Sequence, residues 1–132
     1  MMEEFTVPTT VKEQFINITN TVGEIIQRNK WRNGTIHIFI PHTTAAVTIN
    51  ENADPSVVRD MLYGLSKIVP EGGYHHMEGN SAAHIKSSLI GVSCTIAIEN
   101  QCMILGTWQG IYFCEFDGPR KRTVQVKFIA DR

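Results

Sequence analysis

The sequence predicts an α+β protein: a mostly antiparallel, β-sandwich-like sheet core with two to three helices packed against it. Three observations predict this class. The β-forming stretches are short and are separated by turn residues, helical patterns interrupt them only before Gly91, and everything from Val92 onward has an all-β pattern. The chain has 132 residues and contains no linker or internal repeat, so residues 1–132 are expected to form a single domain.

The first part of the chain predicts an extended segment followed by a helix. Residues 4–17 have an extended pattern, because β-forming side chains gather toward their end. Thr19 or Thr21 can cap the helix that follows, in which apolar side chains recur at helical spacing. The pair Asn33–Gly34 is a strong helix breaker and is expected to end it.

Two strands joined by a polar corner come next. Residues 35–40 and 45–50 alternate their side chains between two faces, as strands do. Pro41 interrupts the first strand because it has no N–H to donate to a sheet. His42 and Thr43 therefore fall in a corner between two strands, where binding and catalytic residues are often positioned.

Two helices are predicted after these strands. Asp54 can cap the first of them and Pro55 suits its first turn, so we expect a helix over residues 55–70. Apolar side chains recur at helical spacing over residues 58–68 and predict a face that packs on the sheet. A shorter helix is expected over residues 80–91, with glycine at its carboxyl end.

The remainder is predicted to consist of strands over residues 92–99, 102–105, 108–116 and 123–129. Cys94, Cys102 and Cys114 are odd in number and lie in these apolar runs, so we expect buried free thiols rather than a disulfide.

Charge and hydropathy exclude several classes of partner. The formal net charge is −1, which gives no general attraction to nucleic acid or to anionic lipid. No apolar run approaches the roughly 20 residues needed to span a bilayer. The acidic amino terminus lacks the basic and apolar regions of a signal peptide, and a cytoplasmic location is expected.

Histidines give the strongest functional signal in the sequence. Three of the five, His75, His76 and His84, lie between Tyr74 and Lys86, and His42 lies in the polar corner. Three converging imidazoles would suit zinc or a similar divalent metal, although spacing alone does not show convergence. His75 and His76 are adjacent and point opposite ways in an extended segment, so at most one is expected in a given site. His37 lies within a strand, where a structural role is the better interpretation.

Other polar residues each have a functional and a plain interpretation. Glu51 can serve as a general base or can be a solvated turn residue. Lys86 and Arg120 can bind phosphate groups, whereas residues 120–122 can equally form a solvated hairpin end. Trp108, between two nearby glycines, can form a wall of a ligand pocket or pack in the core beside a β-bulge.

Several motifs in order along the chain resemble those of the YjbQ family of secondary thiamine-phosphate synthase enzymes. The resemblance covers residues 5–129, with motifs at residues 42–46, 50–54, 74–76, 83–86, 106–111 and 115–120. It implies a compact α+β fold with a β-sandwich-like core, assembly as a homotrimer, and a histidine cluster near a subunit boundary. On this chain the cluster is His42, His76 and His84, with His75 at a variable position.

The resemblance also implies an activity, the joining of hydroxymethylpyrimidine diphosphate to a thiazole phosphate with release of pyrophosphate. The leading hypothesis is therefore a small enzyme that acts on a phosphorylated heteroaromatic ligand with a divalent metal, zinc above all. The predicted metal ligands are His42, His76 and His84, and the predicted catalytic residues are Glu51, His84 and Lys86. The predicted ligand-binding residues are Thr43, Asn52, Trp108, Gln109 and Arg120.

Two further hypotheses stay open at this point. A hydrolase could use the same three histidines and a metal-bound hydroxide, and would release pyrophosphate without a coupled product. A non-catalytic trimeric module could bind a small ligand or a metal without turnover.

Overall fold

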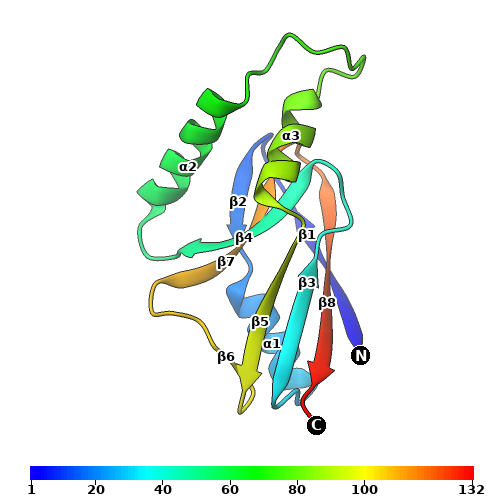
Figure 1. Cartoon of the computed structure of the whole chain (residues 1–132), viewed down its shortest axis with the longest axis vertical. Coiled ribbons are helices and arrows are strands. Elements are labelled where there is room, and N and C mark those ends of the chain that lie inside the picture. The colour runs from blue at the N-terminus through cyan, green and yellow to red at the C-terminus, as the bar shows by residue number, and fades with distance from the viewer.

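The computed structural model describes all of residues 1–132 and contains eight strands and three helices (Figure 1). In chain order these are β1 (Met2–Pro8), β2 (Gln14–Asn17), α1 (Thr19–Arg28), β3 (Gly34–Phe39), β4 (Ala45–Glu51), α2 (Pro55–Ile68), α3 (Ser81–Ile90), β5 (Ser93–Glu99), β6 (Cys102–Met103), β7 (Gln109–Glu115) and β8 (Lys121–Ala130). The predicted α+β class is confirmed.

The strands form two antiparallel sheets. One has five strands in the order β1-β8-β3-β5-β6, and the other has three in the order β2-β7-β4. Residues 35–40 alternate between two faces as predicted: Ile36 and Ile38 are fully buried, and the intervening His37 is half-buried. His37 Nδ1 lies 3.3 Å from the Thr95 hydroxyl on β5, a contact that accounts for it structurally.

A main core fills the space between the two sheets, and α1 contributes to it. Val22, Ile25 and Ile26 of α1 are buried there beside side chains from both sheets, such as Ile36 and Phe113. A second, smaller cluster lies around Tyr112, Cys114 and Phe116, with side chains of α2 and α3 packed against it. The three-stranded sheet therefore has α2 and α3 against its other face, in the upper part of Figure 1.

Four local predictions are corrected. Residues 4–17 form two strands rather than one extended segment: β1 and β2 belong to different sheets, and residues 9–13 cross between them. The cap residue of α1 is Ile18, which makes no side-chain capping bond, and Thr19 instead donates its hydroxyl proton to Asn17.

The other two corrections concern burial. Cys94 and Cys114 are shielded and burial raises the pKa of the Cys94 thiol to about 11, but Cys102 is exposed. The apolar face of α2 is only partly covered: Leu62 and Leu65 are half-buried against the second cluster, whereas Ile68 is 70% exposed.

The ends of four strands meet near α3. The corner between β3 and β4 is held by two backbone bonds, in which Ile40 N–H donates to Val92 O and Phe116 N–H donates to Thr44 O. The turn between β7 and β8 lies at the same end of the sandwich. None of the three helices combines the length and apolar character that crossing a bilayer requires.

Candidate functional site

A polar hollow of about 480 Å³ lies at this end of the sandwich and, apart from Pro41, is lined by polar and charged residues. The β3–β4 corner, the segment before α3, the helix α3 and the start of β8 all contribute to it. Its lining residues are Pro41, His42, Thr43, Thr44, His76, Glu78, Asn80, His84, Arg120 and Arg122. The three histidines predicted from sequence thus border one cavity in a single chain, together with Thr43 and Arg120.

His42 is held in one tautomer. Its Nε2 accepts a hydrogen bond from the backbone N–H of Thr123 at 2.9 Å. A neutral imidazole that accepts at Nε2 carries its proton on Nδ1, so Nδ1 is a donor. Partial burial, together with the nearby Arg122 guanidinium, lowers the pKa of His42. His42 therefore stays neutral at physiological pH and can donate one hydrogen bond.

His76 and His84 lie close together across the hollow. Their ring centroids are 5.6 Å apart and the rings are nearly perpendicular, at 85°. His84 is half-buried on α3, while His76 is exposed in the segment that precedes the helix. His75 is not in the lining, which agrees with the expectation that only one of two adjacent histidines faces a given site.

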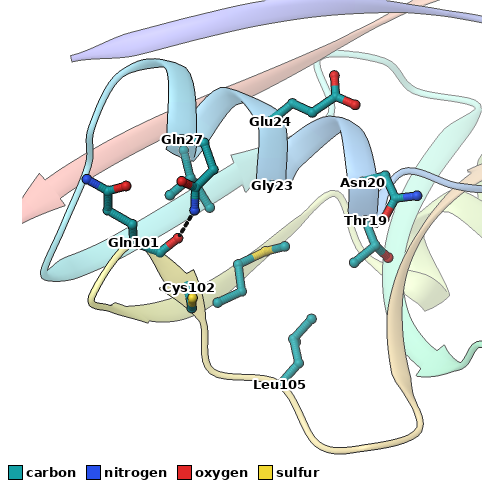
Figure 2. Close-up of a pocket in the computed structure, with 10 residues that line it drawn as sticks. Thr19, Asn20, Gly23, Glu24, Gln27, Gln101, Cys102 and Leu105 are labelled. Carbon is teal, nitrogen blue, oxygen red and sulfur yellow. Dashed lines mark hydrogen bonds between the residues drawn. The ribbon is translucent and has the colours of Figure 1, made fainter.

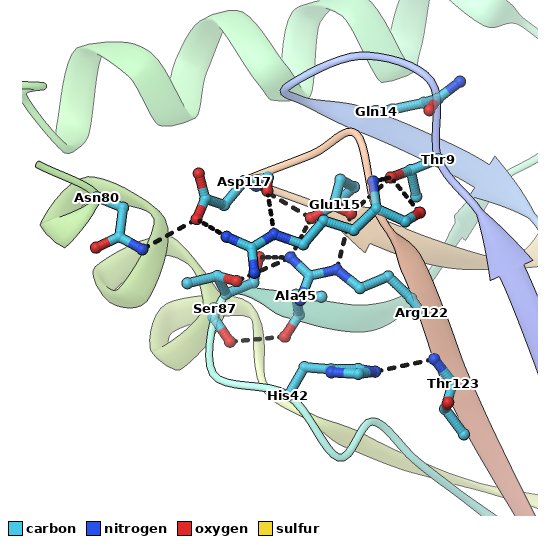
Figure 3. A network of polar contacts seen from close by, with 12 residues as sticks. Thr9, Gln14, His42, Ala45, Asn80, Ser87, Glu115, Asp117, Arg122 and Thr123 are labelled. Atoms are coloured by element: carbon cyan, nitrogen blue, oxygen red, sulfur yellow. Dashed lines mark hydrogen bonds and ion pairs between the residues drawn. The ribbon is translucent and has the colours of Figure 1, made fainter. Parts of the chain in front are cut away.

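Arg122 forms the fixed floor of the hollow, in a network shown in Figure 3. Its guanidinium donates to both carboxylate oxygens of Glu115 and to the carbonyl and hydroxyl of Thr44. Both charged side chains are buried, 4% and 0% exposed. Burial alone would raise the pKa of Glu115, but hydrogen bonds from Arg122, from Asp117 N–H and from Thr9 lower it overall. Glu115 is therefore an anion that orients Arg122.

Arg120 is held in a similar way at the rim. Its Nη2 donates to Asp117 Oδ2 at 2.7 Å, and its Nε donates to the Asp117 carbonyl at 2.8 Å. Asn80 Nδ2 donates to the same Asp117 oxygen at 2.9 Å, which links the start of α3 to the β7–β8 turn (Figure 3). That bond aims the other end of the amide: Asn80 Oδ1 is buried and accepts no hydrogen bond within the chain.

Four of the predicted residues gather elsewhere. Asn52 N–H donates to Trp108 O and its side chain donates to Gln109 O, while the Gln109 side chain accepts from Gly106 N–H. Glu51 ends β4 beside them, and its carbonyl accepts from the Tyr112 hydroxyl. Because β4 is seven residues long, its two ends lie about 20 Å apart, so one chain does not bring Glu51 to the histidines.

Lys86 also lies outside the hollow. Its side chain is 1% exposed and its ammonium forms an ion pair with Glu13, with Glu71 at 3.6 Å. It therefore ties α3 to the β1–β2 connection and to the start of the segment that carries His76. This placement gives Lys86 a structural partner and no contact with the pocket.

The three histidines do not assemble a metal cage in this arrangement. No three His, Cys, Asp or Glu side chains are grouped closely enough to hold an ion. The reason at His42 is specific: Nε2 is already an acceptor and Nδ1 carries the proton, so neither nitrogen presents a free lone pair. His76 and His84 supply two nitrogen donors, fewer than the three protein ligands usual for catalytic zinc.

The most important residue that sequence reasoning missed is Glu115. It stands in a run of apolar side chains that is buried on every side, and a charged residue in such a run signals a buried partner. Asp117 gave less signal, because its turn position already explains an acidic side chain.

A larger cavity, about 700 Å³, lies between α1 and β6 and contains none of the predicted site residues (Figure 2). Met103 and Leu105 line its apolar side, and Gln27 Nε2 closes one edge by donating to Gln101 O at 2.8 Å. The larger cavity is therefore not the one in which the histidines and arginines gather. We base the functional argument on the smaller hollow, because the titratable and hydrogen-bonding groups converge there.

The fold and this pocket define a small two-sheet α+β protein with a histidine- and arginine-lined site. Residues 3–131 match the sequence model of the family described as UPF0047 protein YjbQ-like, so the chain belongs to the YjbQ/UPF0047 family. It is 48% identical to the UPF0047 protein MJ1081 of Methanocaldococcus jannaschii over 100% of this chain and 96% of that protein. It is also 48% identical to the UPF0047 protein YugU of Bacillus subtilis, over 98% and 99% of the two chains.

Solved structures agree with the fold. A conserved YjbQ/UPF0047-family protein from Clostridium acetobutylicum superposes with a TM-score of 0.93 at 55% identity, over 96% of this chain and 99% of that one. The hypothetical protein APE1520 from Aeropyrum pernix K1 gives 0.94 at 35% identity, over 99% of both chains.

Proposed function

We propose that this protein is a small cytoplasmic enzyme that binds the diphosphate of a heteroaromatic substrate in the hollow between His42 and Arg122 and promotes release of pyrophosphate. The reaction is that of a secondary thiamine-phosphate synthase, in which hydroxymethylpyrimidine diphosphate is joined to a thiazole phosphate. The observation that carries the proposal is the fixed tautomer of His42, which makes it a hydrogen-bond donor beside two oriented arginines.

The amino-terminal end of α3 supports an anionic ligand. Asn80 precedes this helix, makes no side-chain capping bond to it and borders the hollow, and the first turn of α3 contains no acidic side chain. The first N–H groups of a helix carry partial positive charge and are common binding points for phosphate. The ten-residue helix α3 is held against β4 by the hydrogen bond from the Ser87 hydroxyl to Ala45 O, so its N–H groups keep a fixed direction.

The pocket binds through oriented donors rather than through net charge. Glu115 balances Arg122, Asp117 balances Arg120, and Glu78 adds a further carboxylate to the lining. Donors fixed before the substrate arrives need no reorganisation as charge develops, and this kind of electrostatic stabilisation is usually the largest contribution to catalysis. Here that charge develops on the departing pyrophosphate, and His84 can protonate it.

A divalent cation, zinc above all, is the alternative occupant. The close approach of His76 and His84 favours it, and the commitment of His42 to Thr123 weighs against it. If a cation bound here, His76 and His84 would hold it, and it would polarise a phosphate oxygen. We derive no step of the mechanism through it.

The residues near Glu51 require a second chain if they are to take part. We propose that the protein is a homotrimer and that Glu51, Asn52, Trp108 and Gln109 of one chain complete the hollow of another. The 63% exposure of the Trp108 side chain supports this, since a large aromatic residue at the surface suits an interface.

Calorimetric titration with inorganic pyrophosphate tests the binding step. Wild type should bind it, and His84→Ala should weaken binding by about 10-fold, the loss expected for one hydrogen bond to a charged group. His75→Ala is the matched control, because it removes an adjacent histidine that does not line the hollow. Equal affinity in all three proteins would refute the assignment of this pocket.

Turnover separates the three hypotheses for activity. Pyrophosphate release from hydroxymethylpyrimidine diphosphate that requires thiazole phosphate supports the transferase. Release without it supports the hydrolase, and binding without release supports a non-catalytic module.

A further inference from the structure

The larger cavity, between α1 and β6, has the size and the lining of a small-ligand site. Its volume of about 700 Å³ falls within the roughly 300–1,000 Å³ range of such pockets. Ile26 in its lining is only 1% exposed, and Met103 and Leu105 are half-buried against the main core. The apolar contacts are therefore recessed, which suits a small molecule inside the cavity better than a flat protein surface laid across it.

A glycine in the middle of α1 keeps this cavity open. Glycine inside a helix costs roughly 1 kcal/mol of stability relative to alanine. A Cβ atom added at Gly23 would meet only Met103 Cε, at 4.0 Å, which is an ordinary van der Waals contact. Close packing within the chain therefore does not require glycine here. The free space beside Gly23 instead allows a ligand to approach the backbone of the helix.

Hydrogen-bonding groups lie at the two ends of the cavity, along the length of α1 (Figure 2). At one end, Gln27 and Gln101 are occupied by their own bond, from Gln27 Nε2 to Gln101 O at 2.8 Å. At the other end, the Thr19 hydroxyl donates one bond and accepts another, which leaves one lone pair. The neighbouring Asn20 side chain is exposed, and its amide can both donate and accept. The Thr19–Asn20 end can therefore bond to one polar group of a ligand.

Charge distinguishes this cavity from the polar hollow. No residue lines both, and no arginine, lysine or histidine lines the larger cavity. Glu24 is its one charged lining residue, and its carboxylate extends to the side of α1 away from Leu105 (Figure 2). An anion would lose hydration here without gaining a counter-charge, whereas an uncharged molecule avoids this cost.

We propose that this cavity is a second binding site, for a small uncharged molecule with an apolar body and one hydrogen-bonding group. The apolar body lies along Gly23, Met103 and Leu105, and the polar group bonds at the Thr19–Asn20 end. This inference goes beyond the proposed function, because the site uses none of the histidines or arginines of the polar hollow.

Alkylation of Cys102 by iodoacetamide would report whether the cavity is occupied, with indole as the probe. Cys102 lines the cavity and is exposed, whereas Cys114 is buried and burial raises the pKa of the Cys94 thiol to about 11. Cys102 should therefore react first, and mass spectrometry identifies the modified thiol. Indole is flat and uncharged and has one N–H donor. At saturation it should slow the alkylation of Cys102 by at least about 5-fold, since only unoccupied chains react.

Gly23→Leu should abolish this protection, because the leucine side chain fills the cavity. Gly64→Leu is the matched control. Gly64 is also a half-buried glycine within a helix, but it lies outside the cavity and a Cβ atom added there meets nothing within 4 Å. Both variants replace a helical glycine by leucine, so they share any gain in helix propensity.

A second ligand tests the charge preference on the wild-type protein alone. Indole-3-carboxylate has the same ring system and a negative charge, and it should protect Cys102 at least about 10-fold more weakly than indole. Equal protection by the two compounds overturns the assignment of an uncharged ligand.

Three other outcomes overturn the site itself. One is that indole gives wild type no protection. Another is that Gly23→Leu and Gly64→Leu behave alike, whether both keep the protection or both lose it. The third is that alkylation slows as protein concentration rises while indole has no effect, which would identify a second copy of the chain as the occupant.

Discussion

Replacing Glu115 by glutamine would test the polar network beneath the pocket. The Glu115 carboxylate is fully buried and accepts hydrogen bonds from Thr9, from Asp117 N–H and from two nitrogens of Arg122. Glutamine has the same size, but it replaces one acceptor by a donor and removes the charge that balances Arg122. Removing one partner of a buried ion pair costs about 3–5 kcal/mol, and we expect the free energy of unfolding to fall by that amount.

Urea unfolding followed by circular dichroism gives the change directly, provided that the slope with urea stays constant. Lys12→Gln is the matched control. Lys12 is 59% exposed and pairs with Glu71 at 3.5 Å, and an exposed ion pair contributes at most about 1 kcal/mol. If Glu115→Gln lost no more stability than Lys12→Gln, the network would not be a main support of this end of the fold.

The pH dependence provides an independent check on the same residue. The folded-state pKa of Glu115 is lowered from the ordinary value of 4.5. A depressed carboxyl pKa contributes stability that is present above that ordinary value and is lost as pH falls toward the folded-state value. Wild type should therefore lose stability on acidification below 4.5 more steeply than Glu115→Gln. Equal slopes would contradict the assignment of the shift.

Four other predictions can be checked by direct measurement. Because the pKa of His42 is lowered in the folded protein, His42 takes up a proton at a higher pH in the unfolded chain than in the folded one. Thermal stability should therefore fall as pH drops below 6.5, and His42→Asn should flatten this dependence on pH. Lys86→Met should cost about 1–3 kcal/mol and should speed hydrogen exchange in residues 71–80, and unchanged exchange would refute the tether. If zinc binds, elemental analysis should show metal loss in His76→Ala and His84→Ala but not in His75→Ala, and equal loss in all three would contradict that ligand pair. Light scattering should give the mass of three 14.8 kDa chains, and a stable monomer at micromolar concentration would contradict the proposed trimer.

Strand and helix positions were largely predictable because local rules decide them. The alternation in residues 35–40 and the Asp54–Pro55 helix start both survive in the structure, where the Asp54 carboxylate accepts from Ser56 N–H at 2.9 Å. The split of residues 4–17 between two sheets was not predictable in the same way. Thr9 lies at the crossing because its hydroxyl bonds to Glu115 and its N–H to Arg120 O, partners more than 100 residues away in the chain.

The position of Lys86 outside the hollow has a geometric cause that was available in the sequence. Residues two apart on a helix point roughly 200° away from each other, so His84 and Lys86 cannot both face one pocket. Lys86 instead faces Glu13, and Asn80 and Ser88 share the face of His84. Its place in a motif suggested a site residue, whereas its position on the helix turns it away from the hollow that His84 lines.

The predicted residues around His42 and those around Glu51 lie at opposite ends of the same sandwich, and strand pairing explains why. His42 and Arg122 adjoin because β3 and β8 pair in one sheet, and Thr123 N–H then reaches the His42 ring. Glu51 belongs to the same strand as the corner but at its far end, so no packing of one chain shortens that distance. Both groups lie in motifs, so motif membership alone does not distinguish them. The pairing of strands in the folded chain does. The same pairing supplies the Thr123 N–H to His42 Nε2, which favours the tautomer that carries its proton on Nδ1.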